Sequence, residues 1–356
     1  MKRYIIILVI SICAVFLWWG MGNIEPIYKR SIEPKEAASF YDNEVLWPRT
    51  ESDKQLAGEA SGVAVNSKGD IYYLHRGSSS FGDKSLVEEP AVIVLDGKTK
   101  EVKERWGRNI FQSPHGIEID SKDNVWITDI LQNKVFQFNS SGEMIRTFGS
   151  DYPFYMESAL RIRNVLPGFP TGMDAYTFAR PTDVTVMEDG SFVVSDGYRN
   201  NRIVKFDKNG KLEWERNERG TKSGEFHLPH GITHDENGRI YVADRSNARV
   251  QVFAKDGNYI ETWTQDELGR PFGIDAGSDG KIYIADGGNE LYENGGKGSN
   301  QVVIMNQQGV ILERFGEWGS GQGAMKIPHD ITVLPNGDIL VADLKNSRLV
   351  TFTPQQ

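Results

Sequence analysis

The chain has 356 residues, of which 39% are hydrophobic and 25% are charged, values typical of a soluble folded protein. Its formal net charge is −9 at pH 7, and this acidic balance argues against a nucleic-acid-binding surface. The 37 glycines suit many tight turns between short strands.

The N-terminal segment differs from the rest. Lys2 and Arg3 precede an uncharged apolar run over residues 4–19, which is typical of a secretory signal or a membrane anchor. No small-x-small cleavage site follows, and no small residue precedes Cys13 as a lipoprotein signal requires. We expect an uncleaved signal-anchor helix over 1–20, crossing the cell membrane once, with the body outside the cytoplasm. A cleaved signal peptide and a secreted body are the alternative. Cys13 is the only cysteine, so the body has no disulfide.

Residues 21–43 mix prolines and charges and are predicted to form a connector, followed by a short strand at Glu44–Trp47. Beyond this strand one pattern recurs. An apolar segment leads to an Asn-Gly or Asp-Gly turn, then to a β-branched strand ending in Asp, and then to a strand ending in Phe. The clearest copy contains Asn237-Gly238, Ile240–Asp244 and Phe253. Such alternation with turn signals predicts strands.

Six copies of this pattern occur, and one repeat position is held by Ser61, His115, Thr182, His230, Phe272 and His329. The mean interval, (329 − 61)/5 or about 54 residues, suits one four-stranded propeller blade with insertions. The sequence therefore predicts an all-β, six-bladed β-propeller over residues 44–356. The last copy stops near Pro354 without an outermost strand, and we expect Glu44–Trp47 to supply it and close the ring.

Two insertions interrupt the repeats. Residues 151–179 carry aromatics and prolines, and residues 287–300 are rich in glycine. Loops of this length in a compact domain are usually functional lids or disordered segments. Whether 151–179 acts as a lid stays open.

Three of the six histidines share one repeat position. They occur in the phrases Pro114-His115-Gly116-Ile117, Pro229-His230-Gly231-Ile232 and Pro328-His329-Asp330-Ile331. The first strand of a propeller blade lines the central axis, so these histidines should lie at one mouth of the channel, in alternate blades about 120° apart. Three converging imidazoles supply three ligands of a tetrahedral zinc ion and leave the fourth position open. A single such histidine is more often a turn residue, but strict alternation favours a metal site.

Other repeated residues are interpreted as structural. The second strand returns to the same mouth and ends in an aspartate in five copies, at Asp129, Asp196, Asp244, Asp286 and Asp343. We expect these carboxylates to accept backbone N–H groups at the strand-to-turn corner. A recurrent arginine, at Arg202, Arg249 and Arg348, is also expected to be structural, and His75, His227 and His234 lie outside the shared register.

The residues after the repeated aspartate vary, and variation within a repeat is where function can be placed. Arg76, Arg245 and Tyr198 are predicted to face the histidines. Arginine binds carboxylates through two N–H groups, and a tyrosine near a dication can act as a base. Asp330 replaces the glycine of the other two phrases. It is either a ligand for a hard cation in the channel or a capped turn, and both interpretations stay open.

Together these stretches resemble a known family. They are Leu74-His75-Arg76-Gly77, Pro114–Asp120, Val125–Asp129, Asp196–Asn200, Ala243-Asp244-Arg245 and Pro328–Ile331. The repeats resemble NHL repeats, and residues 62–352 are similar to peptidyl-α-hydroxyglycine α-amidating lyases. The resemblance implies that His115, His230 and His329 bind zinc. It implies that Tyr198, Arg76 and Arg245 are catalytic. It also implies that Asp330 binds a structural calcium ion through its side chain, and that Val63 and Ile117 bind this ion through their carbonyls.

The resemblance implies a zinc-dependent lyase that cleaves the N–C bond of a peptidyl-α-hydroxyglycine to a peptide amide and glyoxylate. A separate hydroxylating enzyme would supply that carbinolamide. Animal members have a disulfide next to the catalytic tyrosine, where this chain has Arg199, so the Tyr198 loop must be held in another way. The alternatives are a non-enzymatic extracytoplasmic NHL-repeat binding module, or another metal-dependent propeller hydrolase such as a lactonase, which relies on carboxylate and Asn ligands for calcium.

Overall fold

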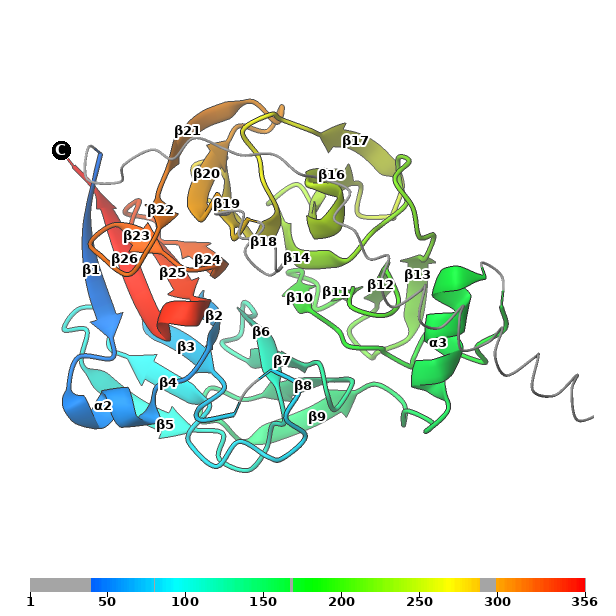
Figure 1. Cartoon of the computed structure of the whole chain (residues 1–356), viewed down its shortest axis with the longest axis horizontal. Coiled ribbons are helices and arrows are strands. Elements are labelled where there is room, and N and C mark those ends of the chain that lie inside the picture. Colours follow the sequence, from blue (N-terminus) through cyan, green and yellow to red (C-terminus); the bar gives the residue numbers. More distant parts are fainter. Residues whose placement is uncertain (1–39, 80, 167–168, 289–298, 356) are drawn as a thin grey trace, which may run out of the picture.

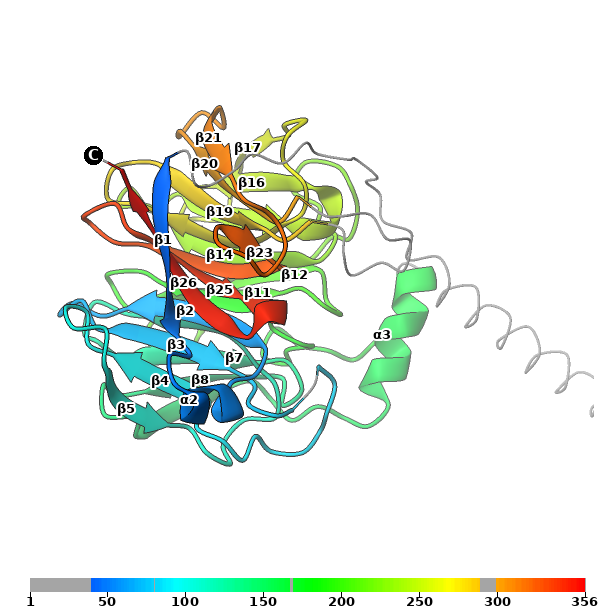
Figure 2. The same ribbon diagram turned by 60° about the vertical axis from the view of Figure 1, so that its left-hand side comes forward.

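The six repeats fold into six four-stranded antiparallel sheets that surround a central axis (Figures 1 and 2). This computed structural model describes residues 40–79, 81–166, 169–288 and 299–355. The predicted all-β, six-bladed propeller is confirmed. The predicted signal anchor over 1–20 and nearly all of the connector over 21–43 lie outside the described residues. Within the described ranges, no helix has the length and apolarity needed to cross a membrane.

The blades follow one another in chain order, and the first strand of each lies innermost, against the first strands of its neighbours. Blade 1 comprises β2 (Ala60–Val65), β3 (Ile71–His75), β4 (Val92–Leu95) and β5 (Val102–Trp106). Blade 2 comprises β6 (Pro114–Ile119), β7 (Val125–Asp129), β8 (Lys134–Phe138) and β9 (Met144–Phe148). Blade 3 comprises β10 (Asp183–Val186), β11 (Phe192–Asp196), β12 (Arg202–Phe206) and β13 (Leu212–Arg216).

Blades 4 to 6 repeat this order. Blade 4 comprises β14 (Pro229–His234), β15 (Ile240–Asp244), β16 (Arg249–Phe253) and β17 (Tyr259–Trp263). Blade 5 comprises β18 (Pro271–Ala276), β19 (Ile282–Asp286), β20 (Gln301–Met305) and β21 (Ile311–Phe315). Blade 6 comprises β24 (Pro328–Val333), β25 (Ile339–Asp343), β26 (Arg348–Pro354) and β1 (Tyr41–Trp47), and the short strands β22 (Glu317–Trp318) and β23 (Ala324–Met325) precede it.

The ring is closed by the strand nearest the N-terminus. β1 pairs antiparallel with β26, and Tyr41 lies opposite Pro354. The predicted closure is confirmed, although the strand begins at Tyr41 rather than at Glu44. Trp47 is 1% exposed and packs against Tyr73, with ring centroids 5.1 Å apart. This pairing covers an edge that the last repeat would otherwise leave open.

The core lies between adjacent blades. Trp126 of blade 2, for example, packs with Val184 and Phe192 of blade 3. Because second strands are covered on both faces, β15 is buried along its whole length, which explains its continuous apolar sequence. The repeated aspartates end these strands as predicted. The Asp129 carboxylate accepts the backbone N–H groups of Gln112 and Ser113 at 2.7 and 3.0 Å, and its equivalents are likewise buried.

Within the described residues, two α-helices lie outside the repeat, and neither was predicted. α2 (Glu51–Leu56) begins with a capping box between Thr50 and Asp53, and is too short to show a hydrophobic period. α3 (Met156–Val165) lies within the 151–179 insertion, at the periphery of the propeller (Figures 1 and 2). Its sequence gave a weak signal because it buries few apolar side chains, chiefly Met156 and Leu160.

The closing strand should contribute strongly to stability. We expect Trp47→Ala to lower the free energy of unfolding by about 3–5 kcal/mol, since it removes a fully buried aromatic side chain. Val45→Ala, on the exposed face of the same strand, should cost less than about 1 kcal/mol. Urea denaturation monitored by circular dichroism measures both values. Similar losses for the two variants would show that β1 is not packed as described.

Candidate metal centre and adjoining active site

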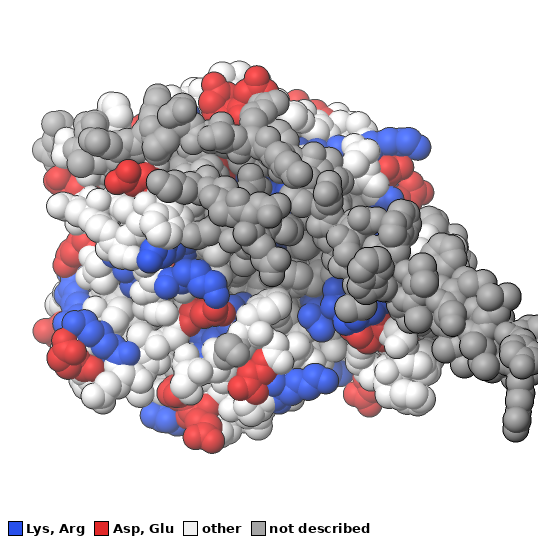
Figure 3. All heavy atoms as spheres, viewed as in Figure 1, with Lys and Arg blue, Asp and Glu red and all other residues white. Residues whose placement is uncertain are grey.

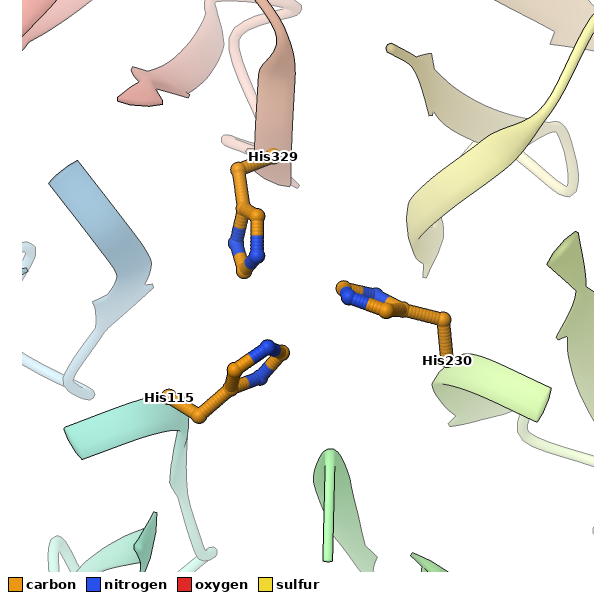
Figure 4. A group of neighbouring side chains, drawn as sticks. All are labelled: His115, His230 and His329. Carbon is orange, nitrogen blue, oxygen red and sulfur yellow. The ribbon is translucent and has the colours of Figure 1, made fainter. Parts of the chain in front are cut away.

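The three histidines of the repeated phrase meet at the central axis (Figure 4). They lie near the starts of β6, β14 and β24, and the pairing register of each strand shifts just after its proline. Such bulges redirect side chains, here toward the axis. The ring centroids of His115, His230 and His329 lie 4.6–4.9 Å apart, and one nitrogen from each ring lies within 4.8 Å of the others. The predicted convergence is confirmed.

Each imidazole is oriented by a backbone carbonyl of the next blade. His115 Nδ1 lies 2.7 Å from the Thr182 carbonyl oxygen. His230 Nδ1 lies 3.0 Å from the Phe272 carbonyl oxygen, and His329 Nδ1 lies 2.8 Å from the Ser61 carbonyl oxygen. Because a carbonyl only accepts, each Nδ1 must carry the proton and each Nε2 keeps its lone pair. Metal-binding histidines are held in this way.

The histidines are in the protonation state that a metal requires. Burial holds the pKa of His115 well below its ordinary value, and the neighbouring His329 and His230 lower it further. Burial and the charges around them similarly lower the pKa of His230 and His329. Neutral imidazoles bind metals without first losing a proton. His230 Nε2 is buried without a hydrogen-bond partner, which a metal ion would supply. The residues therefore fit a metal site.

Two arginines lie beside this cluster with unpaired donors. Arg76 is 1% exposed and donates one Nη1–H to Glu59 at 2.9 Å, while its Nε and Nη2 have no partner. Arg245, in η2 (Arg245–Asn247), is 3% exposed and leaves Nε and Nη1 unpaired. Its guanidinium lies over Phe272, 3.9 Å from the ring centroid, and that ring also contacts His230. Buried N–H groups without acceptors indicate a place for an anionic ligand.

Tyr198 lies at the same mouth. Its hydroxyl is 3.2 Å from His115 Nε2, and because this nitrogen carries no proton, the hydroxyl donates to it. The tyrosine is only half-buried, so a ligand can reach it. Phe81 lies near both Tyr198 and Arg76, with its ring centroid 5.7 Å from the Tyr198 ring and 5.6 Å from the Arg76 guanidinium carbon. No feature of the sequence pattern predicted Phe81 as a residue of the site.

α3 holds the Tyr198 loop by ionic and hydrogen-bonding contacts. Arg199 Nε donates to the Glu157 carboxylate at 2.8 Å. Arg163 Nη2 donates to the Arg199 carbonyl and to Asn200 Oδ1 at 3.2 and 3.1 Å. The 151–179 insertion thus fastens the segment that carries the tyrosine. Arg199, the residue next to Tyr198, is thus itself part of this attachment.

A second polar site lies in the channel. Asp330 lines a cavity of about 70 Å³ together with Val63 and Ile117, as its proposed role in calcium ligation requires. Its Oδ2 accepts the Val63 N–H at 2.9 Å. The same cavity is lined by Asp183 and by two further carboxylates, Glu118 and Asp275. The sequence pattern did not predict that these three carboxylates line the channel, although Asp183 follows the repeat position held by Thr182.

The channel is electrostatically suited to a hard cation. Burial, together with a smaller effect of the nearby Asp275, raises the pKa of Asp330 to about 7. Burial and the Asp330 charge raise the pKa of Asp183 well above its ordinary value. Gly62 lets the inner strands approach closely here, since a Cβ on it would lie 2.7 Å from Ile117 Cγ2 and 3.3 Å from Asp330 Oδ2. Several carboxylates that line one cavity offer the hard oxygen ligands that calcium prefers.

Comparisons with known proteins agree with this geometry. The NHL repeat model matches residues 178–206, 226–253 and 326–352. Peptidyl-α-hydroxyglycine α-amidating lyase 1 of Drosophila melanogaster is 27% identical over 386 residues, covering 95% of this chain and 64% of that protein. Peptidyl-glycine α-amidating monooxygenase of Mus musculus is 30% identical over 345 residues, covering 90% of this chain and 33% of that protein. The chain is similar to peptidyl-α-hydroxyglycine α-amidating lyases and contains NHL repeats.

The chain spans about a third of the length of the vertebrate monooxygenases that it matches. Among solved structures, a gluconolactonase from Xanthomonas campestris superposes with a TM-score of 0.59 at 11% identity, covering 93% of this chain and 99% of that one. At that identity the likeness concerns the fold alone.

Removal of one imidazole should release the metal. We expect the purified protein to carry one transition-metal ion per chain. His230→Ala should retain less than about a tenth of this metal, since two imidazoles hold a metal weakly. His234→Ala is the matched control, because His234 lies on the same strand but its Nδ1 contacts the Thr185 hydroxyl instead. Inductively coupled plasma mass spectrometry measures the content. Equal metal in both variants would contradict the site.

The channel carboxylates predict a pH-dependent effect of calcium. With its raised pKa, Asp330 in the metal-free folded state binds more protons than in the unfolded chain between about pH 4 and pH 7. Its contribution to stability therefore falls as the pH rises through this window, and a bound dication removes the loss. We expect calcium, at about 100 times its Kd, to raise the melting temperature by about 5 °C near pH 7.5 and by less near pH 5.

Two variants control this measurement by differential scanning fluorimetry of metal-stripped protein. Asp330→Asn should lose most of the calcium effect and should melt higher than the metal-free wild type near pH 7.5. Asp83→Asn removes an exposed carboxylate and should behave as the wild type. A calcium effect that is independent of pH and retained in Asp330→Asn would place the cation elsewhere.

Proposed function

We propose that this chain is a zinc-dependent lyase that converts a peptidyl-α-hydroxyglycine to a peptide amide and glyoxylate. One observation carries the proposal: the unpaired guanidinium nitrogens of Arg76 and Arg245 and the Tyr198 hydroxyl surround the three-histidine cluster. An α-hydroxy carboxylate needs this combination of an anion-binding pair, a proton acceptor and a Lewis acid. The names of the relatives support the same reaction class.

The chemistry assigns separate roles to the side chains. The substrate carboxylate would accept N–H groups from Arg76 and Arg245, which fixes the α-carbon at the mouth of the channel. Tyr198 would take the proton of the α-hydroxyl as its oxygen forms the aldehyde C=O. The C–N bond then breaks, its electron pair goes to nitrogen, and the proton that Tyr198 took from the hydroxyl completes the amide. His115, His230 and His329 would hold zinc, which would supply a Lewis acid when bound.

Glu59 and Phe81 would support this arrangement. Glu59 accepts from both Arg76 and Lys345, and so it holds the Arg76 guanidinium while two of that group's nitrogens stay free. Phe81 presents an apolar ring between Arg76 and Tyr198 and would cover the bound hydroxyglycine. Partial exclusion of water strengthens the interactions with the carboxylate.

We also propose that a separate enzyme hydroxylates the glycine α-carbon, since that reaction class makes a carbinolamide. The apolar run over residues 4–19 supports an anchored or secreted body outside the cytoplasm. A calcium-dependent hydrolase with carboxylate ligands is less compatible with a cluster of three imidazoles. A non-enzymatic binding module could use the buried arginine donors to hold an anion, but it would not need a proton acceptor such as Tyr198 beside the histidine cluster.

The proposal predicts glyoxylate release from α-hydroxyhippurate by the zinc-loaded protein, above the rate without protein. We expect Tyr198→Phe to lower kcat by about 100-fold or more, since the variant loses a proton acceptor in the reaction. Its zinc content should match that of the wild type. Tyr259→Phe, on the outer strand of blade 4, should retain full activity.

Glyoxylate is measured by its hydrazone absorbance, and zinc by mass spectrometry on the same samples. Absence of glyoxylate from the zinc-loaded wild type would reject the lyase. Unchanged turnover in Tyr198→Phe would reject the role of the tyrosine while leaving the reaction intact.

A further inference from the structure

A second cleft lies beside the proposed active site, between α3 and the loops of blades 3 and 4. Its volume is about 550 Å³, within the range of sites that hold small ligands or short peptide segments. α3 contributes Arg163 to its wall, the segment after β11 contributes Asn200, and the loop between β13 and β14 contributes Arg219 and His227.

The two arginines of this cleft have most of their donors free. Arg219 Nη1 donates to the Asn164 carbonyl at 2.8 Å, and Arg163 Nη2 donates to Asn200 and to the Arg199 carbonyl. In the part of the chain that the structure describes, neither guanidinium is paired with a carboxylate. A guanidinium carries five N–H groups, so several remain available on each.

Arg163 is half-buried, whereas Arg219 is exposed at the rim of the cleft. Burial and the charges of Arg202 and Arg219 lower the pKa of Arg163, although the Asp196 carboxylate opposes this shift. An anionic ligand beside Arg163 would relieve the cost of its partial burial. Elsewhere on the uncovered part of the face in Figure 3, acidic and basic side chains are interspersed.

Acidic side chains also line the cleft, but they do not pair with Arg163 or Arg219. The Glu225 carboxylate accepts the Lys222 N–H at 3.0 Å and lies 3.7 Å from Lys222 Nζ. Glu218 is exposed to solvent. The cleft thus combines the two arginines, Arg163 and Arg219, with loop carboxylates that are solvated or bonded to Lys222.

The cleft is joined to the proposed active site by shared chain segments. Asn200 follows Tyr198 by two residues and donates to the Asp196 carboxylate. His227 donates its backbone N–H to Asp244 at 2.8 Å and accepts from the Ser246 N–H at 3.0 Å, on either side of Arg245. A peptide whose last residue lies at Tyr198 and Arg245 would therefore have its preceding residues next to this cleft.

We propose that the cleft binds an acidic side chain in the peptide portion of the substrate, upstream of the hydroxyglycine. This inference rests on the proposed function. Arg219 and Arg163 would hold the carboxylate by charge-assisted hydrogen bonds. The enzyme would then prefer peptides with Glu or Asp at one upstream position. A free phosphate or carboxylate ion presents the same chemistry, and the test separates these sources.

Binding of product-like peptides tests the proposal without turnover. Tetrapeptide amides that carry a single Glu at each of the three positions before the last residue, and their Gln counterparts, are titrated into the zinc-loaded protein by calorimetry at constant ionic strength. We expect one position at which Glu binds about fivefold more tightly than Gln. Arg219→Gln should reduce this ratio below about twofold. Lys122→Gln, an equal charge change on blade 2, should leave it unchanged.

Other outcomes overturn the proposal. Equal binding of Glu and Gln peptides at every position rejects it, and so does a preference that survives in Arg219→Gln. Tight binding of phosphate or acetate without any Glu preference assigns the cleft to a free ion and also rejects it. Should Arg219→Gln fail to fold, Thr221→Glu places a carboxylate at the exposed wall of the cleft and should abolish the preference. Turnover of α-hydroxyhippurate, which has no upstream residue, reports separately on the lyase.

Discussion

The metal centre depends on a hydrogen bond that crosses from one blade to the next. Each ligand imidazole donates Nδ1–H to a carbonyl at the start of the adjacent inner strand, so its direction is set by the backbone of the propeller. One of these bonds joins His329 in the last blade to Ser61 in the first. The pairing of β1 with β26 completes the last blade, and in this way the closure of the ring also supports the metal site.

The polar groups of the channel are arranged in two layers of opposite charge. Arg76 and Arg245 lie with the neutral imidazoles at the mouth, whereas Asp183 and Asp330 lie deeper along the inner strands. In each layer, some buried charge has no protein partner of opposite sign that neutralises it fully. Proteins rarely tolerate such a charge unless a ligand is bound. The upper layer suits an anion beside a metal, and the lower layer suits a hard cation. The proposed substrate and the proposed structural cation would thus bind in separate layers.

The repeat register allowed much of this site to be predicted. Because every blade places its first residues at the same mouth, equal positions in the sequence became neighbours in space, which brought together the three histidines and their flanking arginines. Glu59, Phe81 and Glu157 could not be found in that way, because they contact their partners at no repeated interval in the sequence. α3 escaped prediction for a related reason: its role is to contact a loop through charges, so it lacks a broad apolar stripe.

The attachment of α3 to the Tyr198 loop has a consequence for the conditions under which the protein can work. Ion pairs and hydrogen bonds between Glu157, Arg199, Arg163 and Asn200 are indifferent to thiols and oxidants, whereas a disulfide at this place would be broken by reducing agents. The same contacts are partly exposed and therefore weaken as counterions accumulate. The attachment of the Tyr198 loop to α3 should therefore depend on salinity and not on redox conditions.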